Sequence, residues 1–197
     1  MELCLAELEP PQRYKLLNAI VVPRPIAWIT SRSPAGVVNL APFSTFTIVS
    51  YEPPLLGVNM GRRANGERKD SARNAIETGE YVVNIGTEDM IDMIQKSSAP
   101  HPPEVSEVDL LGLSLLPGVD VDVPRLADAP LSMECRLHQV VRFGSSDGEF
   151  VVGEVIRLHS REGLVNDCKI ESESLRPAFR LAGLSYGSLG KITTYQP

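Results

Sequence analysis

The best run of alternating apolar and polar residues, from Leu131 to Phe143, constrains the fold of this chain more than any other feature. The apolar members are Leu131, Met133, Cys135, Leu137, Val141 and Phe143, and the polar members are Ser132, Glu134, Arg136, His138 and Arg142. A period of two predicts a β-strand with one buried and one solvated face, which is typical of antiparallel sheets. We therefore expect Glu134 and His138 to be solvated, and Cys135 to be an inert core thiol.

Further short strands are predicted where apolar runs are bounded by glycine or proline. They are expected at residues 26–31, 37–41, 55–60, 81–85 and 150–156. The turn Pro34-Ala35-Gly36 joins the first two as a hairpin. The 16 prolines and 15 glycines are scattered along the chain, which favours many short strands separated by turns. A sheet of this size usually removes its edges by closing into a barrel.

Two helices are expected beside these strands. Asp70 or Ser71 can cap a short helix over residues 72–77, and Gly79 would end it. Thr87 can start the second helix, whose buried face would contain the following Met90, Ile91 and Ile94. The proline-rich segment 97–107 is expected to be an irregular loop, and its His101 is a weak substrate-site candidate. The expected fold class is therefore a mainly β, antiparallel barrel with a few inserted helices, formed by one domain over residues 1–197.

Charge and composition exclude several classes of function. The chain has 197 residues and a formal net charge of −6, which argues against nucleic acid as a partner and gives no polybasic signal for membranes. No apolar stretch is long enough to span a bilayer, and the acidic N-terminus lacks the basic region of a secretory signal. Three widely spaced cysteines favour a reducing, cytoplasmic location. The three histidines do not have metal-ligand spacing, so no metal is expected.

Three neighbouring segments carry the groups that could bind a ligand. The segments 23–31 and 39–46 supply small hydroxyls, aromatic rings and backbone amides at strand ends, which suit a flat heterocycle. The segment 62–74 contains five basic and two acidic residues, a local net charge of +3 in an acidic protein. It continues into the predicted helix start, where free N–H groups also favour an anion. We interpret this cation island as a phosphate site, with Lys69 its strongest candidate and Arg62 the next.

These segments give the chain a resemblance to a known family. The sequences PRPIAWITS, NLAPFSTF, KDSARNAIETGEYVVNI, VVGEV and RLAG, with the Pro53-Pro54 and Glu134-Cys135 pairs and Tyr186, resemble the FMN-binding split-barrel proteins of the flavin reductase-like family, especially the flavoredoxin type. The resemblance extends from about Tyr14 to Tyr186. It implies a six-stranded split β-barrel, a homodimer, and one flavin per subunit near the dimer interface, with FMN as the expected flavin.

The resemblance also implies a set of cofactor-binding residues. Thr30, Ser31 and the stretch from Ala41 to Ser44 would hold the flavin ring and ribityl chain, and residues 62–71 would hold the phosphate. The implied set is Trp28, Thr30, Ser31, Asn39, Ala41, Pro42, Phe43, Ser44, Asn59, Arg62, Lys69, Asp70 and Ser71. No catalytic side chain is assigned, because the flavin itself carries the redox chemistry.

One departure from the family pattern bears on the electron donor. Many reductases of the family carry a Gly-Asp-His motif where this chain has Ser145-Ser146-Asp147-Gly148-Glu149-Phe150. The implied function is an FMN-dependent oxidoreductase that takes electrons from NAD(P)H or from a redox partner protein. The missing histidine puts direct NAD(P)H oxidation in doubt. A non-catalytic flavin carrier or sensor is the alternative, and a β-barrel interaction module without cofactor would leave the cation island unexplained.

Overall fold

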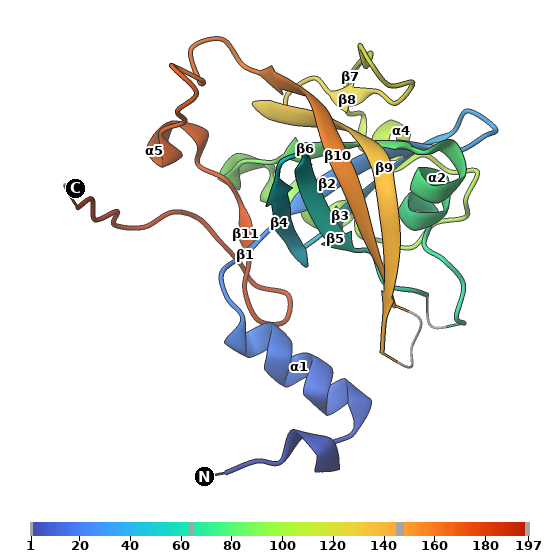
Figure 1. Ribbon diagram of the computed structural model, residues 1–197, viewed down its shortest axis with the longest axis vertical. Helices are drawn as coiled ribbons and strands as arrows, with labels where there is room; N and C mark the ends of the chain where they lie inside the picture. Colours follow the sequence, from blue (N-terminus) through green and yellow to red (C-terminus); the bar gives the residue numbers. More distant parts are fainter. Residues whose placement is uncertain (1, 64, 145–147, 196–197) are drawn as a thin grey trace.

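The computed structural model describes residues 2–63, 65–144 and 148–195, and its main sheet has seven antiparallel strands. Across the sheet these strands run in the order β3-β2-β6-β9-β10-β5-β4, and Figure 1 shows them curving around a common core. Their bounds are β2 Ala27–Arg32, β3 Val38–Phe43, β4 Phe46–Tyr51, β5 Pro54–Asn59, β6 Glu80–Ile85, β9 Leu131–Phe143 and β10 Gly148–Ser160. The mainly β, antiparallel fold class expected from the sequence is confirmed.

Smaller elements surround this sheet. Two short ribbons are formed by β1 Arg24–Pro25 with β11 Phe179–Arg180 and β12 Tyr186–Gly187, and by β7 Leu115–Leu116 with β8 Arg125–Leu126. The α-helices are α1 Pro10–Ile20, α2 Asp70–Thr78, α3 Ile91–Lys96, α4 Glu107–Leu111 and α5 Ser172–Leu175, and the 3₁₀ helices are η1 Leu5–Glu7 and η2 Glu88–Met90. No helix in the described ranges is both long and apolar enough to cross a lipid bilayer.

The apolar face of β9 packs as its sequence period predicts. Cys135 is fully buried in a core cluster with Ile29, Tyr81 and Val151. Burial raises the pKa of its thiol to about 12, so Cys135 is an inert core residue at neutral pH. Phe143, at the far end of the strand, is exposed instead.

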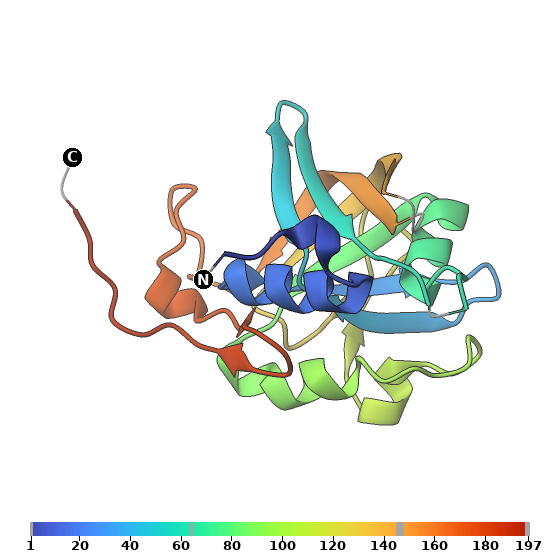
Figure 2. The ribbon, with the colours of Figure 1, turned by 90° about the horizontal axis from the view of Figure 1, so that it is seen from below.

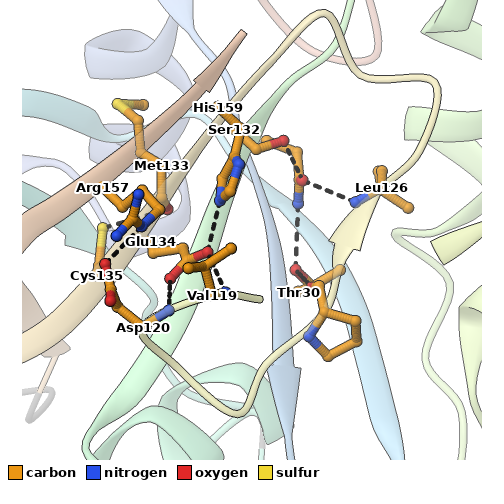
Figure 3. A network of polar contacts seen from close by, with 12 residues as sticks. Thr30, Val119, Asp120, Leu126, Ser132, Met133, Glu134, Cys135, Arg157 and His159 are labelled. Carbon is orange, nitrogen blue, oxygen red and sulfur yellow. Dashed lines mark hydrogen bonds and ion pairs between the residues drawn. The ribbon is translucent and has the colours of Figure 1, made fainter. Parts of the chain in front are cut away.

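The polar face of β9 differs from the expectation at Glu134, which is fully buried rather than solvated. The segment that follows β7 covers this half of the strand, and the Glu134 carboxylate accepts hydrogen bonds from the backbone amides of Val119 (2.8 Å) and Asp120 (2.7 Å). His159 of β10 lies 2.5 Å from the same carboxylate (Figure 3). The expectation for Glu134 is thus wrong, because a covering loop uses the carboxylate as its anchor. His138, beyond this loop, is exposed as expected.

A buried asparagine joins four elements of the same region. The Asn84 amide donates to the Trp28 carbonyl at 2.9 Å, and its oxygen accepts from the Leu126 amide at 3.0 Å and the Ser132 hydroxyl at 2.9 Å. Asn84 also donates to the Thr30 hydroxyl at 3.3 Å (Figure 3). These bonds fix β2, β6, β8 and β9 in one arrangement, since buried polar groups are costly without partners.

Both expected helices form, with one difference at the first. Lys69 is the N-cap of α2 and makes no side-chain cap bond, so Asp70 is the first helical residue rather than the cap. Gly79 ends the helix in the left-handed conformation, as predicted. Thr87 precedes η2 and α3, where Ile94 is fully buried. The segment from residue 97 is irregular up to Ser106, although Glu107 already begins α4.

The N-terminal helix α1 is not anticipated by the sequence pattern. It starts at a reciprocal capping box between Glu9 and Gln12 and has no buried residue. Figures 1 and 2 show α1 lying outside the barrel, next to the mouth formed by the ends of the strands.

Candidate functional site

A large groove of about 1,090 Å³ opens between the barrel and α1. Its walls come from α1, from β1 and the end of β3, from the segment after β5, and from the chain around β11 and β12. Segments far apart in the sequence therefore meet here, as is usual for a ligand site. We call this cavity the main groove.

The charge of the main groove is entirely positive. Its basic residues are Lys15, Arg24, Arg62, Arg63, Lys69 and Arg180. Among the described residues that line it, none is acidic. Because the whole chain has a net charge of −6, this concentration of cations creates a local field that attracts anions.

Six of the residues singled out in the sequence line the main groove. They are Pro42, Phe43, Ser44, Asn59, Arg62 and Lys69. Phe43 closes the inner wall and is buried, whereas Ser44 and Asn59 follow or end strands. The structure thus brings the segments 39–46 and 62–69 to one surface, as the pattern of hydroxyls, aromatic rings and cations suggested.

A smaller cavity of about 170 Å³ lies behind the main groove, and we call it the side cavity. Its lining includes the further sequence candidates Asn39, Ala41, Asp70 and Ser71. It shares Pro42, Phe43 and Lys69 with the main groove. Lys69 therefore belongs to both cavities.

Lys69 is the cation of the island best placed to meet a ligand. Its Nζ lies 5.4 Å from the centroid of the Phe43 ring, and no ion pair with a carboxylate forms within the described ranges. The pKa of Lys69 is lowered from its ordinary value because the surrounding protein reduces its hydration and because Arg63 repels its charge. A bound anion would relieve both effects.

Two other cations of the island, Arg62 and Arg68, share a carboxylate that lies outside the segment 62–74. The carboxylate of Glu149, fully buried at the start of β10, accepts hydrogen bonds from Arg62 (3.1 Å) and Arg68 (2.9 Å). The count of two acidic residues within the segment 62–74 therefore omits a third carboxylate that reaches the island from β10. Hydrogen bonds from Arg68 hold the pKa of Glu149 below its ordinary value, so the carboxylate is charged.

Asp70 organises the other side of the island. It pairs with Arg63 and, at 2.6 Å, with Arg73. The next residue, Ser71, accepts a hydrogen bond from the Asn39 amide at 2.7 Å. The hydrogen bond between Ser71 and Asn39 thus fixes the start of α2 against β3.

The buried Arg24 closes the opposite wall. Its guanidinium donates to the carbonyls of Asn18, Val21 (3.1 Å) and Leu181 (3.0 Å), and its Nε donates to Ser44 at 3.4 Å. Arg24 therefore connects α1, the segment after β11 and the predicted site residue Ser44.

Similarity to known proteins identifies the family of this chain. Residues 19–170 match the sequence model of a protein family described as the flavin reductase like domain. This chain belongs to that family. Chains of Halalkalibacterium halodurans and Bacillus subtilis are 42% and 38% identical to it, over 97% and 95% of its length and 93% and 94% of theirs.

Solved structures of this flavin reductase-like fold are also similar to the chain. Nitrilotriacetate monooxygenase component B from Bacillus cereus is 38% identical, covers 99% of this chain and 98% of its own, and superposes with a TM-score of 0.94. The 2-nitrobenzoate 2-nitroreductase of Pseudomonas fluorescens is 29% identical, with coverage of 100% and 96% and a TM-score of 0.90. The flavoredoxin of Desulfovibrio vulgaris, at 18% identity, coverage of 89% and 91% and a TM-score of 0.77, shares the fold. The split β-barrel expected from the sequence is thereby confirmed.

Three candidates of this flavin reductase-like chain do not reach either cavity. Trp28 is buried and donates from its indole nitrogen to the Ser97 hydroxyl at 2.9 Å. Thr30 donates to the Pro124 carbonyl at 2.6 Å, and Ser31 accepts from Asn74 at 3.3 Å. These hydrogen bonds hold the three side chains in place, and none of the three lines the main groove.

The weaker candidate His101 lies in the wall of the side cavity, together with Glu107. Glu107 is buried, and its carboxylate accepts a hydrogen bond from the Leu40 amide at 2.9 Å. Burial raises the pKa of Glu107 above its ordinary value. Within the described ranges, no group of three or more His, Cys, Asp and Glu side chains could hold a metal ion.

Sequence reasoning about this flavin reductase-like chain missed Glu149 and the structural role of Arg24. Glu149 lies in the stretch compared with the Gly-Asp-His motif, of which residues 145–147 lie outside the described residues. Its pairing with Arg62 and Arg68 leaves no local signal in the sequence. Separations of 81 and 87 positions, to Arg68 and Arg62, are invisible to local pattern analysis.

Proposed function

We propose that this protein is an oxidoreductase that binds FMN in the main groove and passes electrons from a reduced donor to an acceptor. The observation that carries the proposal is the groove itself, with six cations and no acidic residue among its described lining in a member of the flavin reductase-like family. FMN supplies the redox chemistry when bound, and the protein supplies position and electrostatics. The functional unit is one domain over residues 1–197.

The described residues fit FMN in both charge and shape. Lys69 and Arg62 would hold the phosphate, because Lys69 lies at the groove without a carboxylate partner and Arg62 is oriented by the buried Glu149. Phe43 and Pro42 offer an apolar wall for a ring, and Ser44 and Asn59 offer hydrogen bonds.

The remaining candidates would act through these residues. Asn39 and Ser71 bond to one another and, with Asp70 and Ala41, set the position of α2 and of Lys69. Trp28, Thr30 and Ser31 hold the β2 wall behind them. None of these groups needs to exchange a proton with substrate, since their work is to orient a ring and an anion.

The names of two similar proteins point to two kinds of electron acceptor for this chain. One is a component of a monooxygenase and another is a nitroreductase, at 38% and 29% identity. We propose that this chain delivers electrons either to a partner oxygenase as reduced flavin or directly to a small acceptor. The donor would be NAD(P)H or a redox protein.

We also propose that the protein is a homodimer. The helix α1 exposes Leu17 (50%) and Ile20 (68%), and β4 exposes Ile48 (56%) and Tyr51 (84%). Figure 2 shows the β4–β5 hairpin projecting beyond the barrel near α1. Apolar side chains gathered on such projections favour an interface with a second copy. Light scattering of the flavin-loaded protein should return twice the chain mass of 21.5 kDa, and a monomer mass would contradict the dimer.

Two measurements test the function. A titration with FMN, followed by flavin fluorescence, should show saturable binding of one FMN per chain, and absence of binding would exclude the proposal. Steady-state oxidation of NADH and of NADPH with FMN present should then show turnover. If FMN binds tightly while neither nucleotide, nor a reduced redox protein, transfers electrons, the protein is a flavin carrier or sensor instead.

A further inference from the structure

The six cations of the main groove form two separate clusters. Arg62, Arg63 and Lys69 belong to the segment between β5 and α2, whereas Lys15, Arg24 and Arg180 come from α1, β1 and β11. In both ribbon views the segment leading into α2 and strand β11 lie on opposite sides of the barrel (Figures 1 and 2). We call the second group the distal cluster. One phosphate cannot use both clusters.

Arg180 is a cation of the distal cluster whose hydrogen bonds hold its guanidinium in place. Its Nη1 donates to the Gln95 side chain at 3.2 Å, and its Nε and Nη2 donate to the Gly183 carbonyl at 3.1 and 2.6 Å. Its guanidinium carbon lies 4.4 Å from the centroid of the Tyr186 ring. The Tyr186 hydroxyl donates to the same Gln95 oxygen at 2.9 Å, so this triad is rigid.

The rigid guanidinium still has hydrogen-bonding capacity. Arginine carries five N–H donors, and the described contacts of Arg180 use three of them. No carboxylate pairs with Arg180 among the described residues. An arginine held in place beside an aromatic ring in the wall of a cavity is suited to bind a planar carboxylate or a phosphate.

The two other cations strengthen this site in different ways. Arg24 is buried and bonded to the carbonyls of Asn18, Val21 and Leu181, so its charge is fixed beneath the cluster. Lys15 is exposed on α1, and no hydrogen bond or ion pair involves its side chain in the described chain. It can therefore turn toward a ligand.

We infer that the distal cluster binds the anionic group of the second substrate, a planar ring that carries a carboxylate or phosphate. This inference rests on the proposed function, which assigns the first cluster to the phosphate of FMN. Arg180 and Lys15 would then be specificity-determining residues for the electron donor or acceptor.

The test compares small ring compounds that differ in charge. Benzoate, phenyl phosphate and the neutral benzamide are titrated into the FMN-loaded protein by calorimetry, and into the flavin-free protein in parallel. We expect benzoate or phenyl phosphate to bind about tenfold more tightly than benzamide, as one or two charge-assisted hydrogen bonds would give. The tighter of the two anions identifies the group that the site prefers.

Variants then locate the binding site. Arg180→Gln and Lys15→Gln should each remove most of the preference for the anion, while Lys96→Gln, an equal charge change at an exposed position on α3 outside the groove, should retain it. Lys15→Gln removes no internal contact, so it remains informative if Arg180→Gln fails to fold. FMN affinity should stay unchanged in all three variants.

Two outcomes would overturn the inference. Equal affinities for benzoate, phenyl phosphate and benzamide in the wild type would show that no anion subsite exists. An anion preference that survives both Arg180→Gln and Lys15→Gln would place it elsewhere. If FMN itself fails to bind while the flavin-free protein still distinguishes benzoate from benzamide through Arg180, the proposed function falls and the subsite stands.

Discussion

Arg68 donates hydrogen bonds from two nitrogen atoms to the buried carboxylate of Glu149. Its Nε lies 3.0 Å from both carboxylate oxygens, and its Nη2 lies 2.9 Å from Oε1. The side chain of Glu149 is inaccessible to solvent, whereas that of Arg68 is 36% exposed. The hydrogen bond with Glu149 raises the pKa of Arg68 and lowers that of the carboxylate. This pair connects the loop after β5 to strand β10 and gives the cation island its shape.

The first prediction concerns this pair. Glu149→Gln should destabilise the protein by about 1–3 kcal/mol, because the hydrogen bonds to two arginines lose their charge and a buried partner is weakened. Chemical denaturation, followed by far-ultraviolet circular dichroism, measures the change. Glu67→Gln is the matched control, since Glu67 is exposed and its side chain accepts a hydrogen bond from the exposed Asn65.

The same pair sets a dependence on pH. A carboxyl whose pKa is lower in the folded than in the unfolded state stabilises the fold fully above the ordinary glutamate value of about 4.3, and loses this contribution as the pH falls through the lower folded value. Below pH 4, wild-type stability should therefore fall more steeply than that of Glu149→Gln. Parallel curves for the two proteins would contradict a charged Glu149.

The second prediction concerns Lys69. Lys69→Met keeps an apolar stem against Phe43 but removes the charge, so FMN should bind about ten- to a hundredfold more weakly. Riboflavin lacks the phosphate, and its affinity should hardly change. Both ligands are titrated by flavin fluorescence against the wild type and Lys69→Met.

The lowered pKa of Lys69 gives a second test of whether this residue binds the FMN phosphate. Because that pKa is lowered in the free protein, FMN affinity in the wild type should decline with rising pH before an ordinary lysine would lose its proton. Lys69→Met should lack this decline. Equal losses for FMN and riboflavin in Lys69→Met would mean that the residue shapes the cavity generally and does not bind the phosphate.

The sequence predicts the fold well because its strongest signals are local. The alternation in β9 and the turn at residues 34–36 depend on neighbouring residues, and both appear in the structure. The same local view fails at Glu134, since its burial depends on a covering segment about 15 positions away in the chain. It also provides no signal for α1, whose residues remain exposed.

The candidate site is predicted in part for the same reason. Lys69 and Phe43 were recognised by residue type in short segments, and they do line one groove. The partners that orient the site are distant in sequence: Glu149 pairs with Arg62 across 87 positions, and Arg24 reaches Leu181 across 157. Only the folded arrangement brings these charges together.

The third prediction tests the packing of the barrel core. A methyl group at Gly153, on the bulged strand β10, would lie 2.2 Å from the Tyr81 hydroxyl and 2.7 Å from its Cζ. Tyr81 is fully buried, so it has no room to move. Gly153→Ala should lower the free energy of unfolding by about 1–3 kcal/mol.

Two further variants show whether the loss of stability comes from the contact between residue 153 and Tyr81. Gly190→Ala, where an added methyl group has no neighbour within 4 Å, should leave the thermal midpoint unchanged. The double variant Gly153→Ala/Tyr81→Phe should recover part of the loss, because the nearest clashing atom is gone. A Gly153→Ala protein as stable as the wild type would show that β10 and Tyr81 can separate.

The last prediction concerns the buried pair of Glu134 and His159. Burial alone would raise the pKa of Glu134, but the hydrogen bonds with His159 and with the amides of Val119 and Asp120 outweigh it, and the pKa lies below its ordinary value. Glu134→Gln offers one amide oxygen and a donor group in place of two acceptors. It should therefore release the covering segment and cost about 1–3 kcal/mol.

Hydrogen exchange distinguishes this local effect from a general loss of stability. In Glu134→Gln the amides of Val119 and Asp120 should exchange much faster than in the wild type, while the amides of β2 and β3 keep their protection. His159→Gln, which leaves both amide bonds to Glu134 in place, should show a smaller increase at the same two positions. Unchanged exchange at Val119 and Asp120 in Glu134→Gln would mean that the segment is held by its apolar contacts, through Val121 and Val123, and that the buried carboxylate has no anchoring role.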